Sequence, residues 1–249
     1  MIEARSLGKT FGEKEAVRNL NLDVGEGEMF VLLGPNGAGK TTTLKLLTTL
    51  LKPTYGHASV AGFDVFESPD EVKRRIGYVP DTPALYERLT GREFLHFIAD
   101  IRGTKERASI DRSLTLFEMD ENADKLIETY SHGMKKKIAL SAALLHQPQV
   151  LFLDEPTGGL DPYSARLMKD LLTRLCSQGV AVFMTTHIME IAEQLCERVG
   201  ILYEADLMAC GTLEELRAEH GDLSLEDIFM KVTGADASLM EVDLWEKTE

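Results

Sequence analysis

Two adjacent carboxylates occupy a position suited to phosphate chemistry. Asp154 and Glu155 directly follow Val150–Leu153, a short apolar segment that predicts a buried strand. At such a strand end the first acid can help to hold Mg²⁺, and the second can orient or polarise an attacking water. Glu155 could instead only cap the following turn, but its place beside Asp154 favours a catalytic role.

A phosphate-binding loop lies nearer the N-terminus. Residues 34–41 match the pattern G-x-x-x-x-G-K-[ST] at every position. An apolar segment at 29–33 precedes the loop and a helical pattern at 42–47 follows it, which is the context that the motif requires. The glycines let backbone N–H groups turn toward phosphates, and the helix N-terminus adds partial positive charge. We expect Lys40 to reach the terminal phosphates and the Thr41 hydroxyl to join the Mg²⁺ shell.

A small Ser-x-Gly turn precedes the carboxylates by about 20 residues. It reads Tyr130-Ser131-His132-Gly133-Met134 and enters a helical run from Lys135 to Leu145. Few phosphate-loop proteins have such a turn just before the carboxylate strand, and its helix N-terminus would face an anion. The three lysines that follow, at 135–137, either add positive field to this site or form a solvated basic face.

The order of elements predicts an α/β fold. Residues 1–28 alternate apolar and polar side chains, as in an antiparallel sheet with one wet face. Strand-like runs recur at 29–33, 75–79, 150–153, 180–185 and 199–203, with helical patterns between several of them. The prediction is a phosphate-loop (RecA-like) core with a mostly parallel sheet and an N-terminal antiparallel β-subdomain. Strands disappear between about 82 and 147, which predicts an inserted α-helical subdomain, and two more helices are expected after Gly211.

Composition and charge narrow the class of protein. The chain has 249 residues and a net charge of −14, and it contains no apolar run that approaches the roughly 20 residues needed to span a bilayer. Its first residues lack the pattern of a signal peptide, so we expect a cytoplasmic protein. Residues 213–249 carry eleven acids against three bases. This acidity argues against nucleic acid as a partner, because nucleic-acid binding depends on many Lys and Arg contacts with phosphate.

Over residues 1 to about 210 the chain resembles the nucleotide-binding subunit of an ATP-binding cassette (ABC) transporter. Six motifs stand in the order of that family. They are Phe11 in an aromatic position, residues 34–42 as the phosphate loop, 76–81 as the coupling loop, 131–134 as the signature, 151–155 with Asp161 after it, and 185–187 ending in the switch histidine.

The resemblance implies a role for each matching residue. ATP would be bound by Phe11, Val17, Asn36, Gly37, Ala38, Gly39, Lys40, Thr41 and Thr42. Mg²⁺ would be held by Thr41, Asp154 and Asp81. Glu155 and His187 would be catalytic. Ser131, His132, Gly133 and Met134 would bind the ATP of the opposite subunit, and Asp161 would link the two sites. Phe11 could instead be a core residue, and His187 could be a helix N-terminal residue without a substrate.

Two motifs depart from the family pattern. The signature is usually Leu-Ser-Gly-Gly-Gln, but its phosphate-contacting elements persist here as Ser131 and Gly133. The coupling-loop glutamine is replaced by Asp81, either a hard oxygen ligand that keeps the contact with Mg²⁺ or a solvent-facing residue that has lost it. Loops and signatures of this kind resemble the ABC-2-like branch, which mostly serves export.

The resemblance implies the ATPase subunit of an exporter. Because the chain carries one set of motifs, a complete site needs a second nucleotide-binding subunit, in a homo- or heterodimer. Separate integral membrane permease subunits would hold the pair at the cytoplasmic face of the membrane. The ABC ATPase domain is expected at 1–212 and an acidic helical extension at 213–249. Two alternatives are a soluble ABC ATPase that acts on ribosomes or nucleic acid, and a regulatory ATP-binding module.

Overall fold

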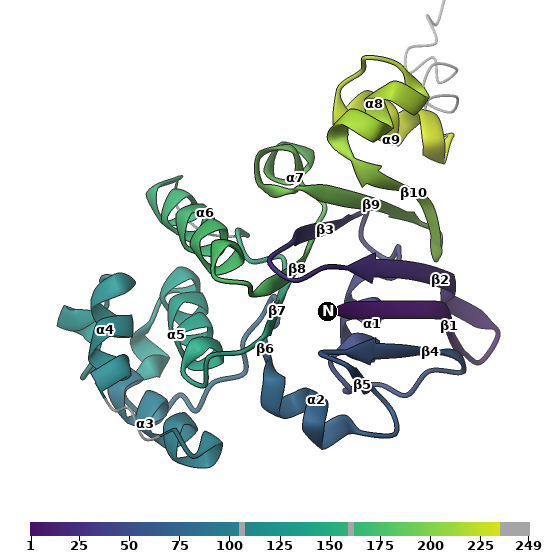
Figure 1. The fold of residues 1–249 in the computed structure, drawn as a ribbon. Coiled ribbons are helices and arrows are strands. Elements are labelled where there is room, and N and C mark those ends of the chain that lie inside the picture. The colour runs from purple at the N-terminus through teal and green to yellow at the C-terminus, as the bar shows by residue number, and fades with distance from the viewer. Residues whose placement is uncertain (105–107, 159–161, 235–249) are drawn as a thin grey trace, which may run out of the picture.

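The chain folds around two β-sheets (Figure 1). The computed structural model describes residues 1–104, 108–158 and 162–234. The smaller sheet has four strands in the order β2-β1-β4-β5 and is antiparallel. Its strands are β1 (Ile2–Phe11), β2 (Lys14–Val24), β4 (Tyr55–Val60) and β5 (Phe63–Asp64). The alternation of apolar and polar residues predicted the first two strands. Strands β4 and β5 pair beside them from a segment for which no strand was predicted.

The larger sheet is the one that positions the motifs. Its six strands run in the order β10-β9-β3-β8-β7-β6, all parallel to their neighbours except β10. They are β3 (Met29–Leu33), β6 (Ile76–Val79), β7 (Val150–Asp154), β8 (Ala181–Thr186), β9 (Arg198–Tyr203) and β10 (Asp206–Thr212). Every residue of β3, β7 and β8 is buried. Such continuous apolar runs are typical of parallel strands that are covered on both faces.

Alternate residues of the central strand enter two different hydrophobic cores. Phe30 and Leu32 pack in the core that the larger sheet shares with the antiparallel sheet, α1 (Lys40–Leu47) and α2 (Pro69–Arg75). Val31 and Leu33 pack in the core on the other face. Helices α6 (Pro162–Ser177) and α7 (Met189–Leu195), labelled in Figure 1, contribute side chains to that second core. The sheet is therefore the middle layer of the molecule.

The predicted helical insertion forms a lobe beside the second face of the sheet (Figure 1). It contains α3 (Gly91–Arg102), α4 (Ala108–Leu116), two short 3-10 turns at Asp120–Asn122 and Ile127–Thr129, and α5 (His132–Leu144). A capping box between Thr90 and Glu93 begins α3, and Gly103 ends it in the left-handed conformation. Ser131 begins α5, because its Oγ accepts a hydrogen bond from the Met134 N–H at 3.2 Å.

The last described elements are two helices that pack against α7 and β10. They are α8 (Leu213–His220), with a Thr212–Glu215 capping box, and α9 (Leu225–Thr233), capped by Ser224. The Phe229 ring of α9 meets Tyr203 edge-on at 6.4 Å, and Arg217 pairs with Glu193 of α7 at 3.0 Å. The two helices match those expected after Gly211, while a domain boundary at 212 stays a prediction. None of the helices within the described ranges is long and apolar enough to cross a bilayer.

Candidate functional site

Three neighbouring strands bring the motifs together at one edge of the larger sheet. Strand β8 lies between β3 and β7, and all three are parallel, so their carboxyl ends meet. The phosphate loop follows β3, the two carboxylates end β7, and His187 follows β8. In open parallel sheets ligands bind in the crevice outside these strand ends. The arrangement places the candidate site there.

A pocket of about 390 Å³ marks the site. Ten of the predicted site residues line it, together with Lys14, Ala16 and Pro35; the ten are Phe11, Asn36, Gly37, Gly39, Lys40, Thr41, Thr42, Asp81, Asp154 and Glu155. Phe11 lies on the rim and is 51% exposed, so its ring is accessible to a flat ligand. Ala38 and Val17 are buried and are absent from the described lining.

The phosphate loop has a backbone that only glycine allows at one critical point. Gly39, immediately before α1, has a φ of 113°. A Cβ atom at this position would lie 2.2 Å from the Ala16 carbonyl oxygen of β2. The residue therefore needs both the left-handed conformation and the close approach, which a side chain would prevent. The loop is fixed against the antiparallel sheet before any ligand binds.

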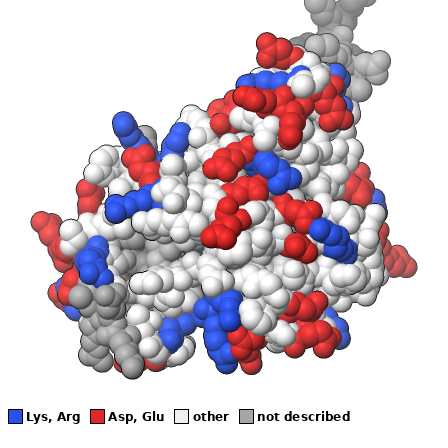
Figure 2. All heavy atoms as spheres, viewed as in Figure 1, with Lys and Arg blue, Asp and Glu red and all other residues white. Residues whose placement is uncertain are grey.

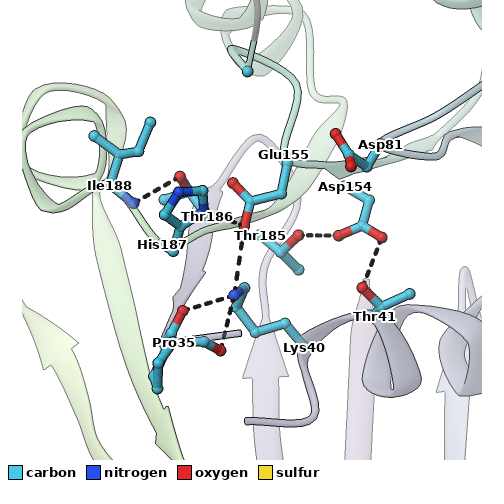
Figure 3. Close-up of polar contacts among 12 residues, drawn as sticks. Pro35, Lys40, Thr41, Asp81, Asp154, Glu155, Thr185, Thr186, His187 and Ile188 are labelled. Atoms are coloured by element: carbon cyan, nitrogen blue, oxygen red, sulfur yellow. Dashed lines mark hydrogen bonds and ion pairs between the residues drawn. The ribbon is translucent and has the colours of Figure 1, made fainter. Parts of the chain in front are cut away.

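Lys40 is held inside this loop. Its side chain is 6% exposed, and its Nζ donates hydrogen bonds to the carbonyl oxygens of Gly34 at 2.6 Å and Pro35 at 3.2 Å. The same Nζ lies 3.4 Å from Oε1 of Glu155 (Figure 3). These three oxygens give each of the three N–H groups of the ammonium an acceptor. The positive charge is thus aimed across the pocket at the second carboxylate.

Asp154 is held by two hydroxyl groups. Thr41 Oγ1 donates to its Oδ2 at 2.9 Å, and Thr185 Oγ1 of β8 donates to its Oδ1 at 2.6 Å (Figure 3). Asp154 is buried and is only 3% exposed. Burial raises the pKa of the nearby Tyr78 phenol to about 12, and the charge of Asp154 adds to the rise. Tyr78 therefore stays neutral beside the carboxylate.

Glu155, which lines the pocket, pairs with His187, which is not among the described lining residues. His187 Nδ1 lies 2.9 Å from Glu155 Oε1 (Figure 3), and a neutral imidazole would donate its Nδ1 proton to that oxygen. Glu155 adopts a φ of 47°, unusual for a residue with a side chain, and its N–H donates to the Thr185 carbonyl oxygen. This backbone turns the Glu155 side chain away from the buried strand and toward Lys40 and His187.

The signature residues lie elsewhere. Ser131, His132, Gly133 and Met134 form the start of α5 in the helical lobe, and none of them is among the described residues that line the pocket. Ser131 and His132 are exposed. Asp161, predicted to link two sites, lies outside the described residues. The structure thus brings the phosphate loop, the two carboxylates and His187 together, and it leaves the signature apart from them.

Two polar contacts of the site were not predicted. Thr185 lies in the segment recognised from its histidine, but its hydrogen bond with Asp154 was not foreseen. Lys136, one of the three lysines at 135–137, is buried and reaches the backbone of Glu155 at 2.6 Å. The two alternatives for residues 135–137 were a positive charge that acts at the signature and a solvent-exposed basic face. Neither describes Lys136.

The hydroxyl of Thr185 provides a first test of the site. Thr185→Val keeps the shape of the side chain but removes the donor to a buried carboxylate. We expect the free energy of unfolding, measured by urea denaturation, to fall by about 1–3 kcal/mol. Thr185→Ser keeps the hydroxyl and is the matched control, with a smaller loss. Equal stability of the valine variant and the wild type would contradict the role assigned to this bond.

Comparison with known proteins agrees with this geometry. Residues 17–158 match the family model described as ABC transporter. The probable multidrug ABC transporter ATP-binding protein YbhF of Escherichia coli (strain K12) is 38% identical over 240 residues, 93% of this chain and 41% of YbhF. The bacitracin transport ATP-binding protein BcrA of Bacillus licheniformis is 38% identical over 221 residues, 88% of this chain and 71% of BcrA. The chain therefore spans less than half the length of YbhF.

Solved structures give the same result for the fold. A structure described as the ATP binding subunit of an ABC transporter superposes with a TM-score of 0.88 at 31% identity, over 94% of this chain and 99% of that one. The dimeric structure of MJ0796, a bacterial ABC transporter cassette, gives a TM-score of 0.79 at 27% identity, over 86% and 99%. The predicted fold class is confirmed. From the family match and the extent of these similarities, the chain belongs to the ABC transporter family.

Proposed function

We propose that this chain is the ATP-hydrolysing subunit of an exporter and that it works as a dimer with a second nucleotide-binding subunit. One observation carries the proposal: the phosphate loop and both carboxylates line one pocket, while the signature turn begins a helix of the other lobe. A single chain thus offers two unlike half-sites. A second subunit that faces it would complete both.

Each half-site supplies different contacts to ATP. Lys40 and the backbone N–H groups of residues 36–42 bind the phosphates, and the exposed Phe11 ring stacks on the adenine. The signature residues 131–134 of the second subunit close over the γ-phosphate, where the N-terminus of α5 adds partial positive charge. The dimeric form of MJ0796 among the similar structures supports this arrangement.

We propose Mg²⁺ as the cofactor. Thr41 Oγ1 and Asp154 Oδ2 lie 2.9 Å apart and are the hard oxygen donors that Mg²⁺ prefers. No Lys or Arg within the described ranges pairs with the buried Asp154 carboxylate. No three His, Cys, Asp or Glu side chains among the described residues are arranged to hold a metal ion by themselves, which fits an ion bound through few protein ligands and substrate phosphates. When bound, Mg²⁺ neutralises charge on the β- and γ-phosphates.

Asp81 is a further candidate ligand. It lines the same pocket, and Figure 3 shows it beside Asp154. Its Oδ1 lies 3.2 Å from the Nζ of Lys136, and its side chain is 55% exposed. A carboxylate has two oxygens, so Oδ2 would be available to the cation while Oδ1 keeps its lysine. This geometry supports two contacts for Asp81, one with Lys136 and one with the metal.

The hydrolytic step belongs to Glu155 and His187 in this proposal. The Glu155 carboxylate orients or polarises a water for in-line attack on the γ-phosphate. His187 holds that carboxylate through Nδ1 and is 50% exposed, so its other ring nitrogen can contact the γ-phosphate. Lys40 exchanges its contact with Glu155 for the phosphates when ATP binds, and its charge then stabilises the negative charge that develops in the transition state.

A groove beside the edge strand β6 supports a membrane permease as the further partner. It measures about 1120 Å³ and lies between α2 of the core and α3 and α5 of the lobe. Its lining combines the exposed apolar residues Leu50 and Ile101 with basic residues Lys73, Arg74 and Arg102. Figure 2 shows Lys and Arg side chains gathered over α2. We propose that a permease segment docks here and attaches the dimer to the cytoplasmic face of the membrane.

Affinity purification tests the proposed function. A tagged chain recovered from detergent-solubilised membranes is expected to carry a multi-span membrane protein and to hydrolyse ATP. Ile101→Asp places a charge in the groove and is expected to release the membrane protein, while ATP hydrolysis by the free chain persists. Met208→Asp, at an exposed apolar position on β10 outside the groove, is the control. Recovery of ribosomes in place of a membrane protein would contradict the proposal.

A further inference from the structure

A buried lysine connects the helical lobe with the hydrolytic end of the pocket. Lys136 lies in the second turn of α5, and its side chain is 2% exposed. Its Nζ donates to the carbonyl oxygens of Glu155 at 2.6 Å and Gly158 at 2.9 Å. It also forms an ion pair with Oδ1 of Asp81 at 3.2 Å. The three N–H groups of the ammonium thus have three acceptors, from two loops that follow β6 and β7.

We infer that Lys136 is a positioning residue, which holds the Glu155 turn and Asp81 in the geometry that hydrolysis needs. The role presupposes the ATPase activity proposed above. A buried ammonium is costly unless charge and hydrogen bonds compensate it, and here one carboxylate and two carbonyls do so. Its neighbour Lys135 shows the ordinary alternative, because its Nζ pairs with the exposed Glu87 at the surface.

The contact with the Glu155 carbonyl bears directly on the direction of its carboxylate. Glu155 has a φ of 47°, and a side-chain-bearing residue in this region stores strain that the surroundings must offset. The Thr185 carbonyl holds the N–H of Glu155, and Lys136 holds its carbonyl together with the Gly158 N–H. Both peptides that flank the Glu155 Cα are thereby fixed. Without Lys136 only the Gly158 N–H restrains the second peptide, so the Glu155 carboxylate is held less firmly in its direction toward His187 and Lys40.

Asp81 completes the arrangement from the other loop. The ion pair with Lys136 restrains one of its oxygens at the rim of the pocket. Gly158 lies in the same cluster: a Cβ atom added there would be 3.4 Å from Lys136 Nζ and 4.0 Å from Asp81 Oδ1. The Nζ atom of Lys136 therefore joins α5 to the coupling loop and to the turn after β7. It lies at the boundary between the helical lobe and the core, and it is not one of the proposed phosphate contacts.

The test is the steady-state kinetics of Lys136→Met in the full chain, alone or in the permease complex. The variant keeps the length of the side chain and removes its charge and donors. We expect kcat to fall by about 10- to 100-fold, since misplacement of a reacting group by about 1 Å has effects of this size. The KM for ATP and the affinity for ATP are expected to stay within about threefold, because Lys136 makes no proposed contact with the nucleotide.

Matched variants separate positioning from a general structural effect. Lys135→Met removes the same charge one residue away and is expected to leave kcat within twofold. Lys136→Arg keeps the charge and N–H donors and is expected to retain more turnover than Lys136→Met. Turnover is expressed per bound nucleotide, so that partly unfolded protein does not count. If Lys136→Met does not fold, Lys136→Arg carries the test, with a lower kcat at unchanged ATP affinity as the supporting result.

Magnesium dependence distinguishes the two roles of Asp81. Asp81→Asn is expected to raise the Mg²⁺ concentration for half-maximal turnover more than Lys136→Met does, because the lysine variant keeps the Asp81 carboxylate. Unchanged kcat in Lys136→Met, or loss of ATP binding together with turnover, would overturn the positioning role while wild-type hydrolysis still supports the proposed function. A wild-type chain that hydrolyses no ATP, alone or with its permease, would overturn both.

Discussion

Replacing Glu155 by Gln is expected to lower ATP turnover by about 10²- to 10⁴-fold, the contribution typical of a positioned general base. The amide keeps the size of the side chain and a hydrogen-bonding oxygen for His187, whose Nδ1 lies 2.9 Å from Oε1. It cannot accept a proton from water. ATP binding is expected to persist, because Lys40 and the loop backbone remain, so an ATP-bound dimer should accumulate.

Single-turnover hydrolysis and size-exclusion chromatography with ATP measure these two effects. Glu204→Gln is a closely matched control, because Glu204 is an exposed glutamate with the same φ of 47° in the turn before β10. Its turnover should equal that of the wild type. A Glu155→Gln variant that retains a tenth or more of wild-type turnover would show that another group activates the water.

Replacing Lys40 by Met is expected to weaken ATP binding by about 10- to 100-fold and to abolish measurable turnover. Hydrogen bonds to charged groups contribute about 1.5–3 kcal/mol, and 1.4 kcal/mol corresponds to a factor of ten in affinity. Lys40 has a second function in the free protein, because its Nζ holds the Gly34 and Pro35 carbonyls at 2.6 and 3.2 Å. The variant therefore loses both a phosphate contact and the internal support of the loop.

Titration with a fluorescent ATP analogue measures the affinity of the Lys40 variant. Lys45→Met is the matched control: Lys45 lies on the same helix, α1, but its side chain faces solvent. The control should bind the nucleotide like the wild type. An affinity of Lys40→Met within threefold of the wild type would mean that the loop backbone alone binds the phosphates, and the charge of Lys40 would then act only in turnover.

The parts of the site that sequence could predict are those in which local pattern decides the structure. The phosphate loop has its strand and helix as immediate neighbours, and Gly39 is required by its own backbone. Asp154 and Glu155 end an apolar strand, so their place at the sheet edge follows from the alternation of strands and helices. Their convergence with His187 requires only that β3, β8 and β7 be adjacent, which the family resemblance implies.

The parts that could not be predicted depend on contacts between distant segments. Val17 was expected to bind ATP but is buried in β2, while Ala16 lines the pocket. Side chains alternate along a strand, so neighbours in sequence point to opposite faces. The helical periodicity of the sequence indicates that Lys136 is buried, although a charged residue at that position is expected to be exposed. Together with Ala139, Leu140 and Ala143 it occupies the i, i+3, i+4 and i+7 positions of a buried helix face.

Helix α5 makes two functional contacts near its N-terminus. Its first residues form the signature turn, and Lys136, five residues after the Ser131 cap, touches the Glu155 backbone. The two contacts lie about 7.5 Å apart along the axis of one continuous helix of 13 residues, so a displacement of this end of the helix would affect both. A dimer built in this way would contain two such helices. Each would contact one nucleotide at its N-terminus and would position the hydrolytic residues for the other nucleotide. Hydrolysis of one ATP would therefore change the geometry of the other site, and the two hydrolysis reactions of the dimer would be coupled.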